Sequence, residues 1–287
     1  MKVAVIGVGV MGSAIAGRLL DVGASVSLFD LDAAKAAPLV ARGAVMTSSP
    51  ATATAQADFV ITSLNNAATI ERAVFGPDGV AASANADKLL IDMSSIDPAR
   101  TAAMSERLQA ETGMGWVDAP LSGGAPAAAN GTLTLMVGGS DDHVQRAATV
   151  LRHLARNSTH LGPSGAGQTV KLINQILCAN YFIAVAEAVK FAEDNGVDAT
   201  LIPAALAGGR ADSRILQEFM GKMARRDFSP TGRIDNMLKD LETVASASKS
   251  PLPVTGQITD IHRALVSAGL GTHDSAEYIK LFDLAKS

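Results

Sequence analysis

The chain has 287 residues, of which 48% are hydrophobic and 18% are charged, and its net charge is −4. This length and apolar content can bury one large core or two ordinary ones, and they argue against intrinsic disorder. The acidic balance, with no block of lysine or arginine, argues against nucleic acid or a basic membrane-surface helix.

The numbers and spacing of cysteine and histidine residues limit which disulfides and metal sites the chain can form. Cys178 is the single cysteine, which excludes an intramolecular disulfide and a cysteine-rich zinc site. The five histidines show no ligand spacing, so we expect no metal. The N-terminus superficially resembles a signal peptide, but glycines interrupt its apolar run and cleavage would remove a predicted strand. No uninterrupted apolar stretch reaches the ~18–20 residues of a membrane span, and we expect a cytoplasmic protein.

Strand and helix patterns alternate through the first half of the chain. Short β-branched runs predict strands, and helical spacing follows them after short connections. This alternation predicts an α/β fold, a Rossmann-type doubly wound parallel sheet with helices on both faces. The predicted strands cover 2–6, 25–29, 44–46, 58–64, 88–92, 116–118 and 132–137, and a helix is expected over 141–155.

Beyond residue 165 the strand signals disappear and only helical patterns remain. A glycine- and proline-containing segment at 160–165 marks the expected boundary between an NAD-binding Rossmann domain, 1–163, and an all-helical substrate and oligomerisation domain, 164–287. Glycine and proline separate the predicted helices, which cover 168–195, 200–207, 213–225, 233–249, 254–268 and 274–284.

The helix predicted over 168–195 joins the two domains. It is apolar on nearly every side, which predicts burial all round. At ~1.5 Å per residue it would run ~40 Å, longer than a small domain needs. We therefore expect part of it to be buried against a second subunit, in a homodimer or homotetramer.

A glycine-rich turn follows the first predicted strand. Residues 7–12 read Gly-Val-Gly-Val-Met-Gly, a Gly-x-Gly-x-x-Gly pattern between a strand and a helix. Gly7 permits the tight turn, Gly9 lets a pyrophosphate approach the backbone, and Gly12 lets helix and strand pack closely. N–H groups at the helix start would face the anion. The pattern predicts a dinucleotide site.

Asp30 supports this hypothesis. It lies eighteen positions past Gly12, at the end of the second predicted strand. There a carboxylate can accept hydrogen bonds from the adenosine ribose and would repel a 2′-phosphate. The alternative is a helix-capping or turn role. No arginine follows immediately, so we expect NAD (NADH) as the cofactor in preference to NADP.

Later segments narrow the class of enzyme. Residues 118–133 read Asp-Ala-Pro-Leu-Ser-Gly-Gly-Ala-Pro-Ala-Ala-Ala-Asn-Gly-Thr-Leu, residues 165–174 read Gly-x-Gly-x-x-x-Lys-x-x-Asn, and residues 237–241 read Met-Leu-Lys-Asp-Leu. Residues 92–98 read Asp-Met-Ser-Ser-Ile-Asp-Pro. Together with the glycine turn, these motifs resemble those of the β-hydroxyacid dehydrogenase family over essentially the whole chain. Two departures are Arg18, for a common asparagine, and Ser95, for a threonine.

The resemblance implies hydride transfer between a nicotinamide and a small hydroxy acid, with Lys171 as the general acid/base. A lysine can do this when burial beside the cofactor lowers its pKa toward the working pH. Asn174 lies one turn on and shares its face, and the loop at 122–124 can offer a hydroxyl and backbone N–H groups to a carboxylate. Substrate contacts are implied for Ser122, Gly123, Gly124, Asn174, Gln175 and Lys239, and cofactor contacts for Gly7, Gly9, Val10, Met11, Gly12, Asp30, Leu64, Asn65, Ser95, Lys239 and Asp240.

Each feature has a simpler interpretation when it is taken alone. A lysine near a helix start is usually solvated or extends from an apolar face, which would be the better interpretation of Lys171 by itself. The serine and glycines at 122–124 would be a turn, and the charges at 239–240 would be an exposed helix face. Their order behind a nucleotide motif favours the functional interpretation.

The substrate within the family is a separate question. The segments at 171–175, 207–213, 227–230 and 232–235 resemble tartronate semialdehyde (2-hydroxy-3-oxopropionate) reductases most, with 3-hydroxyisobutyrate dehydrogenase as the runner-up and L-threonate or L-serine dehydrogenases as further alternatives. Two other classes are imine reductases, which generally lack a lysine at the position of Lys171, and non-catalytic NAD-binding scaffolds. The presence of Lys171 and Asn174 counts against both.

Overall fold

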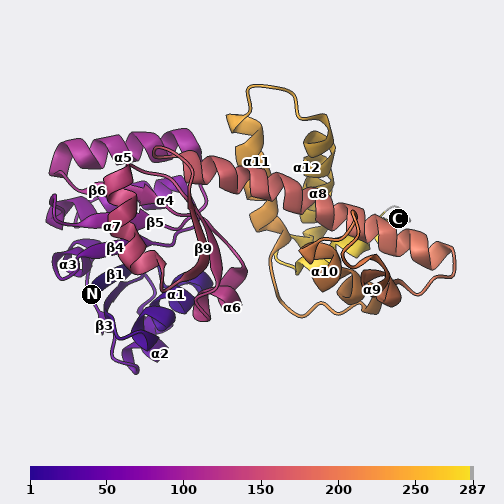
Figure 1. Ribbon diagram of the computed structural model, residues 1–287, viewed down its shortest axis with the longest axis horizontal. Helices are drawn as coiled ribbons and strands as arrows, with labels where there is room; N and C mark the ends of the chain where they lie inside the picture. The colour runs from indigo at the N-terminus through magenta and orange to yellow at the C-terminus, as the bar shows by residue number, and fades with distance from the viewer. Residues whose placement is uncertain (285–287) are drawn as a thin grey trace. The chain divides into compact units, whose positions relative to one another are not determined.

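The computed structural model describes residues 1–284, which form two compact units, Met1–Lys171 and a second unit that begins at Leu172. Unit 1 contains a six-stranded parallel sheet in the order β3-β2-β1-β4-β5-β6 (Figure 1). The doubly wound α/β fold is therefore confirmed. The strands are β1 (Lys2–Ile6), β2 (Ser25–Phe29), β3 (Val45–Met46), β4 (Phe59–Thr62), β5 (Leu89–Asp92) and β6 (Gly115–Asp118).

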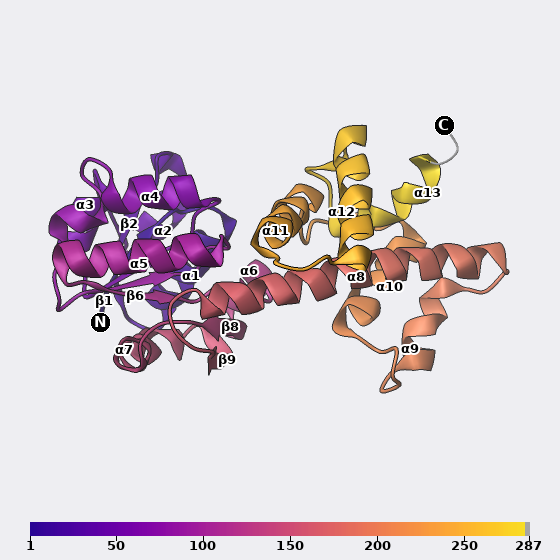
Figure 2. The same cartoon turned by 90° about the horizontal axis from the view of Figure 1, so that it is seen from above.

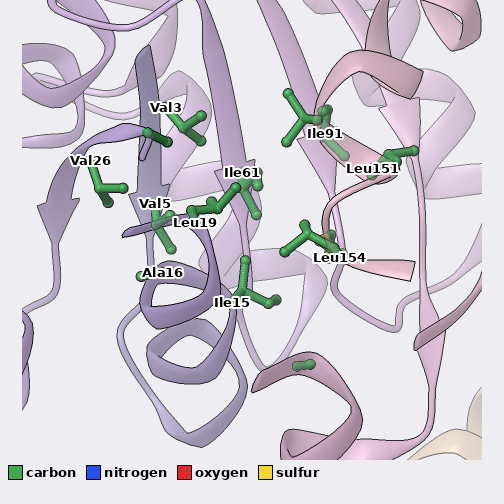
Figure 3. Packing of buried hydrophobic residues seen from close by; sticks show 14 of the residues in the cluster. Val3, Val5, Ile15, Ala16, Leu19, Val26, Ile61, Ile91, Leu151 and Leu154 are labelled. Atoms are coloured by element: carbon green, nitrogen blue, oxygen red, sulfur yellow. The ribbon is translucent and has the colours of Figure 1, made fainter. Parts of the chain in front are cut away.

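Alternate residues of each central strand enter two separate cores. In β1, Val3 and Val5 belong to one apolar cluster and Ala4 and Ile6 to the other, as the two-residue period of a strand requires. Figure 3 shows the first cluster, in which Val3 and Val5 pack near Ile15, Leu19 and Ile61. Helices α1 (Val10–Asp21), α6 (Gly124–Ala129) and α7 (Asp141–Leu151) contribute to the first core, and α3 (Pro50–Ala55), α4 (Ala67–Phe75) and α5 (Pro98–Thr112) to the second.

Short helical turns complete this sheet unit. They are η1 (Ala33–Ala36), α2 (Ala37–Val40) and η2 (Val80–Ser83). Several helices begin at a polar side chain that accepts a backbone N–H of the first turn; Asn66, for example, accepts the N–H of Thr69 at the start of α4.

A second, three-stranded sheet differs from the sequence-based expectation. The strand predicted over 132–137 does not join the main sheet; it is β8 (Leu133–Val137), paired with β7 (Leu121–Ser122) and β9 (Ala155–His160). The helix predicted over 141–155 ends at Leu151, so its last turn was wrong. The strand β9 was missed because its sequence, Ala-Arg-Asn-Ser-Thr-His, is polar and mostly exposed and shows no apolar alternation.

Helix α8 (Ala166–Asp194) starts in unit 1 and continues into unit 2, where other helices pack against it. Figure 2 shows α10, α11 and α12 gathered about this part of α8, and their apolar side chains share one core with Ile183 and Val189. The elements of unit 2 are η3 (Ala199–Leu201), α9 (Ile202–Leu206), α10 (Arg214–Arg225), α11 (Ile234–Ala247), α12 (Pro253–Leu265), the π-helical turn η4 (Val266–Leu270), η5 (Ser275–Lys280) and α13 (Leu281–Leu284).

Burial of α8 is one-sided in the single chain. Ala179, Ala186 and Val189 are fully buried, whereas Phe191 is 71% exposed and Tyr181 is 44% exposed. The prediction of burial on every side is therefore wrong for the chain on its own. By length and composition α8 could also cross a membrane, since an 18-residue window reaches a mean hydropathy of 1.5. Core helices of soluble proteins share these properties, and the inner face of α8 forms the core of unit 2.

Candidate cofactor and substrate site

The glycine turn between β1 and α1 has the geometry that its pattern predicts. Gly7 has a φ of +94°, a left-handed conformation that favours glycine. A Cβ at Gly12 would lie 1.8 Å from the carbonyl oxygen of Gly7, so any side chain there would separate strand and helix. A Cβ at Gly9 would meet no heavy atom within 4 Å. The open approach at Gly9 and the N–H groups at the start of α1 fit a dinucleotide pyrophosphate.

Asp30 follows β2 and is bonded directly to this turn. Its Oδ2 accepts the N–H of Val8 at 2.7 Å, and its Oδ1 accepts the N–H of Asp32 at 2.9 Å. The side chain is 13% exposed, and Lys35 Nζ lies 3.7 Å from Oδ1. Asp30 therefore has the turn role that was the alternative, and it also stands beside the glycine turn, as a ribose-binding carboxylate must.

The other predicted cofactor residues of unit 1 follow strands of the same sheet. Val10 and Met11 open α1, Leu64 and Asn65 follow β4, and Ser95 follows β5. Carboxyl ends of parallel strands meet at one edge of the sheet, and the order of the strands reverses between β1 and β4. Ligands of doubly wound sheets bind at this place. The Leu64 N–H donates to Ser94 Oγ at 3.0 Å, which ties the β4 and β5 loops together.

The predicted substrate loop runs from the last residue of β7 to the first residue of α6. Gly123 has a φ of +119° and Gly124 a φ of +70°, so the backbone at both positions favours glycine. A Cβ at Gly123 would lie 2.7 Å from the Cβ of Ala127. Ser122 is the last residue of β7 and is partly buried.

Lys171 lies close to this loop in unit 1. Its Nζ donates a hydrogen bond of 2.9 Å to the carbonyl oxygen of Leu121, the residue before Ser122. The side chain is partly buried and is not the solvated lysine of the simpler interpretation. The amine and the Ser122–Gly124 loop are thus brought together by one backbone contact.

Two buried carboxyl groups of unit 1 were not predicted from the sequence as functional residues. Asp92 and Asp118 end the neighbouring strands β5 and β6 and are paired across the sheet. Burial raises the pKa of Asp92 to about 6, although hydrogen bonds from Ser94 and Thr62 oppose this shift. Burial also raises the pKa of Asp118, against backbone N–H bonds that lower it. Polar residues at the ends of otherwise apolar strands were the signal available in the sequence.

The predicted residues of unit 2 form their own chain of contacts. Asn174 Nδ2 donates to Gln175 Oε1 at 2.8 Å, and Gln175 Nε2 donates to Asp240 Oδ2 at 2.6 Å. Lys239 Nζ lies 3.0 Å from Asp240 Oδ1. Asp240 is buried, whereas the Lys239 side chain is 40% exposed. Asp240 therefore holds both an amide and an ammonium group, so Lys239 is not simply a solvated helix charge.

The predicted site residues thus form two groups, one in each unit. The first contains the glycine turn, Asp30, the 122–124 loop and Lys171, and the second runs from Asn174 to Lys239. Within residues 1–284 no three His, Cys, Asp or Glu side chains are grouped as metal ligands.

Two family models match the sequence. One, described as the NAD binding domain of 6-phosphogluconate dehydrogenase, covers residues 2–162, and the other, described as the NAD-binding of NADP-dependent 3-hydroxyisobutyrate dehydrogenase, covers residues 165–282.

Individual proteins are similar over nearly the full length. The chain is 34% identical to 2-(hydroxymethyl)glutarate dehydrogenase of Eubacterium barkeri, over 99% of this chain and 95% of that protein. It is 32% identical to 2-hydroxy-3-oxopropionate reductase of Escherichia coli, over 99% and 98%. The solved structure of Mycobacterium tuberculosis 3-hydroxyisobutyrate dehydrogenase with L-serine has a TM-score of 0.88 and 30% identity and covers 98% of each chain.

Proposed function

Because the chain belongs to the β-hydroxyacid dehydrogenase family of nicotinamide-dependent oxidoreductases, we propose that Lys171 is the general acid/base of its hydride transfer. One observation carries this proposal: the Nζ of Lys171 is held 2.9 Å from the Leu121 carbonyl, directly before the loop proposed to bind the substrate carboxylate. A bound nicotinamide would supply the hydride donor or acceptor. The dinucleotide that carries this nicotinamide would be held by the glycine turn, Asp30, Leu64, Asn65 and Ser95.

The side chains of the two groups would have separate tasks. Lys171 would take the hydroxyl proton during oxidation and return it during reduction, for which one group within hydrogen-bond reach suffices. Ser122 and the backbone N–H groups of Gly123 and Gly124 would bind the carboxylate. Asn174 uses its Nδ2 on Gln175, so its Oδ1 would be left to accept from a second, non-reacting hydroxyl of the substrate, because the proton of the reacting hydroxyl passes to Lys171. Lys239, held by Asp240, would add positive charge for the anionic substrate and cofactor.

The proposed cofactor is NAD in preference to NADP. The Asp30 carboxylate is bonded to the glycine turn through Val8, where it can accept from ribose hydroxyls and would repel a 2′-phosphate. Lys35, at 3.7 Å, offsets part of this negative charge, so the preference should be a ratio of affinities and not absolute.

We propose tartronate semialdehyde (2-hydroxy-3-oxopropionate) as the substrate that is reduced, with 3-hydroxyisobutyrate as the second candidate. The similarity to the Escherichia coli reductase over nearly the whole chain supports the first, and the fold shared with the mycobacterial 3-hydroxyisobutyrate dehydrogenase supports the second. L-threonate and L-serine belong in the same test, because relatives carry those names at 34% identity.

The proposed assembly is a homodimer or homotetramer in the cytoplasm, with the second domain beginning near residue 164. Large apolar side chains are exposed along one face of α8 at helical spacing, at Ile173, Leu177, Tyr181 and Phe191. A groove of about 450 Å³ beside them is lined by Val197, Leu206, Met220 and others. Contiguous apolar surface of this kind usually marks an interface, and a second copy of the chain is the simplest partner.

The reaction is tested with purified protein, NAD or NADH, and a panel of 3-hydroxy acids and semialdehydes. The nicotinamide absorbance should change with one substrate, and Lys171→Ala should lower kcat by about 10²–10⁴-fold while NADH binding stays intact. Retained kcat in Lys171→Ala would refute the acid/base role. No absorbance change across the panel, with NADH bound, would refute the proposed substrates.

A further inference from the structure

The start of α8 is held by a carboxylate from a distant strand end. Asp118 is fully buried; its Oδ1 accepts the N–H of Gly165 at 2.9 Å and its Oδ2 accepts the N–H of Gln168 at 3.1 Å. N–H groups in the first turn of a helix have no partner within the helix, so Asp118 acts as its cap from outside. The negative charge also suits the positive end of the helix dipole.

Gln168 fixes the same turn to a second strand end. Its side chain is fully buried, its Nε2 donates to the Ser94 carbonyl at 2.9 Å, and its Oε1 accepts the Ile96 N–H at 3.2 Å. Both of these side-chain hydrogen bonds go to backbone groups of residues that follow β5. Rotation of α8 about its axis would break them together.

Glycines leave the helix start no room to shift. A Cβ at Gly167 would lie 2.4 Å from the Met136 carbonyl oxygen and 2.8 Å from Asp118 Oδ2. A Cβ at Gly138 would lie 2.7 Å from both carboxylate oxygens of Asp118. The backbone at Gly138 and at Gly167 is therefore in close contact with the Asp118 carboxylate, and Gly167 is also in close contact with the Met136 carbonyl. Since one residue of an α-helix turns through about 100°, a small slip here would redirect Lys171.

The segment that begins with Asp118 also contains the target of Lys171. Three residues after Asp118, the Leu121 carbonyl accepts the hydrogen bond from Lys171 Nζ, and the Ser122–Gly124 loop follows at once. One short stretch of chain thus caps the helix that carries Lys171, accepts the hydrogen bond of the Lys171 amine, and contains the loop proposed to bind the substrate.

We propose that Asp118 and Gln168 are positioning residues, which fix the start of α8 so that Lys171 points at the Ser122–Gly124 loop. This inference rests on the proposed role of Lys171. It assigns both residues an effect on turnover that passes through Lys171, beyond any effect on the stability of the fold. A displacement of about 1 Å at a reacting group can lower the rate by about 10²-fold.

The test compares three variants. Asp118→Asn keeps the size but places an NH₂ group against one of two backbone N–H groups, and Gln168→Met keeps the length without hydrogen bonds. Asp274→Asn is the matched control, because Asp274 is also a buried carboxylate that caps a helix start, at η5 in unit 2, where its Oδ1 accepts the Ala276 N–H at 2.9 Å. Gln168→Met covers the case in which Asp118→Asn does not fold.

Two readouts need no substrate. We expect hydrogen exchange in a peptide spanning 165–171 to become at least about tenfold faster in Asp118→Asn and Gln168→Met, because opening of the first turn is no longer opposed. The rate at which acetic anhydride labels the Lys171 amine, read by mass spectrometry, should change in the same variants. Neither readout should change in Asp274→Asn, whatever that variant loses in thermal stability.

Turnover gives the third readout. We expect kcat to fall about 10–100-fold in Asp118→Asn, with the KM for NADH within about twofold of the wild type. Added to Lys171→Ala, the same substitution should change the residual rate by less than about twofold, because the group that it positions is gone.

Unchanged exchange and labelling in both Asp118→Asn and Gln168→Met would overturn the proposal. So would an equal loss of kcat in Asp274→Asn, or independent losses from Asp118→Asn and Lys171→Ala. An inactive wild type would instead refute the proposed function, and the exchange and labelling data would still decide whether Asp118 and Gln168 hold Lys171 in place.

Discussion

Asp92 is one buried group through which the stability of this protein depends on pH. The Thr62 hydroxyl and the Ser94 N–H both donate to its Oδ1, whereas its Oδ2 has no hydrogen-bond partner within residues 1–284. Burial without a second partner raises the pKa of Asp92 to about 6 from an ordinary 3.8. The folded protein therefore binds this proton more tightly than the unfolded chain does. The contribution of the protonated Asp92 carboxyl to stability is fully present below pH 4 and is lost as the pH rises through about 6.

We predict that Asp92→Asn stabilises the protein at neutral pH. A pKa raised by about two units corresponds to about 3 kcal/mol, which is the upper limit of the gain in stability. The gain can approach this limit because the asparagine oxygen can keep both hydrogen bonds that Asp92 accepts. Urea unfolding at pH 4 to 8 measures the effect. The variant should be more stable than the wild type above pH 6 and should show a smaller decline between pH 4 and 6; equal pH profiles would contradict the prediction.

Asp30 carries the second prediction at the residue scale. Asp30→Ala removes the carboxylate that we propose to bind the ribose and to repel a 2′-phosphate. The affinity for NADH should therefore fall, and the ratio of NADPH affinity to NADH affinity should rise. Fluorescence titration with both nucleotides gives the two dissociation constants. Equal changes for the two would mean that Asp30 acts only as the turn residue that bonds Val8 and Asp32.

At the scale of elements, the turn between β1 and α1 separates a folding role from a binding role. Gly12→Ala should destabilise the protein by about 1–3 kcal/mol or more without any ligand, because its Cβ would lie 1.8 Å from the Gly7 oxygen. Gly9→Ala has open space and should leave the melting temperature nearly unchanged, yet weaken NADH binding. Thermal melts and NADH titration measure the pair. Wild-type NADH affinity in Gly9→Ala would show that no pyrophosphate approaches here.

Elements with a local pattern could be predicted from the sequence, and contacts between distant elements could not. The strand, turn and helix at 2–21 and the carboxylate at Asp30 follow from periodicity and glycine chemistry over a few residues. The bonds from Asp118 to Gly165 and Gln168 join positions about 50 residues apart, and no local pattern distinguishes such a carboxylate from a turn residue. The polar edge strand β9 gave no apolar signal either.

At the scale of the whole molecule, the exposed face of α8 is the surface that we propose to meet a second copy of the chain. The sequence predicted an apolar helix but not which side the chain itself would cover, since burial depends on all the helices that pack against it. The side chains exposed on α8 lie on the face opposite the unit 2 core, and Phe191 is 71% exposed.

We predict that Phe191→Asp lowers the oligomeric state. A charge at a buried interface is costly, whereas at an exposed position it changes the stability of the single chain little. Light scattering should give a smaller mass than the wild type, with the far-ultraviolet circular dichroism retained. Val254→Asp, at a 61% exposed apolar position on α12, serves as the control and should keep the wild-type mass. A monomeric wild type, or an unchanged mass for Phe191→Asp, would contradict the prediction.

The bond from Asp118 to the start of α8 also bears on the order in which the chain is made. During synthesis, the carboxylate of Asp118 is made 47 residues before the Gly165 N–H that it accepts. Until that residue arrives, the end of β6 cannot be buried without leaving a carboxylate unsatisfied, at a penalty of about 1–3 kcal/mol or more. The sheet should therefore complete its folding late, once residues 165–168 have left the ribosome. A fragment for expressing the nucleotide-binding unit alone should accordingly extend through the first turn of α8.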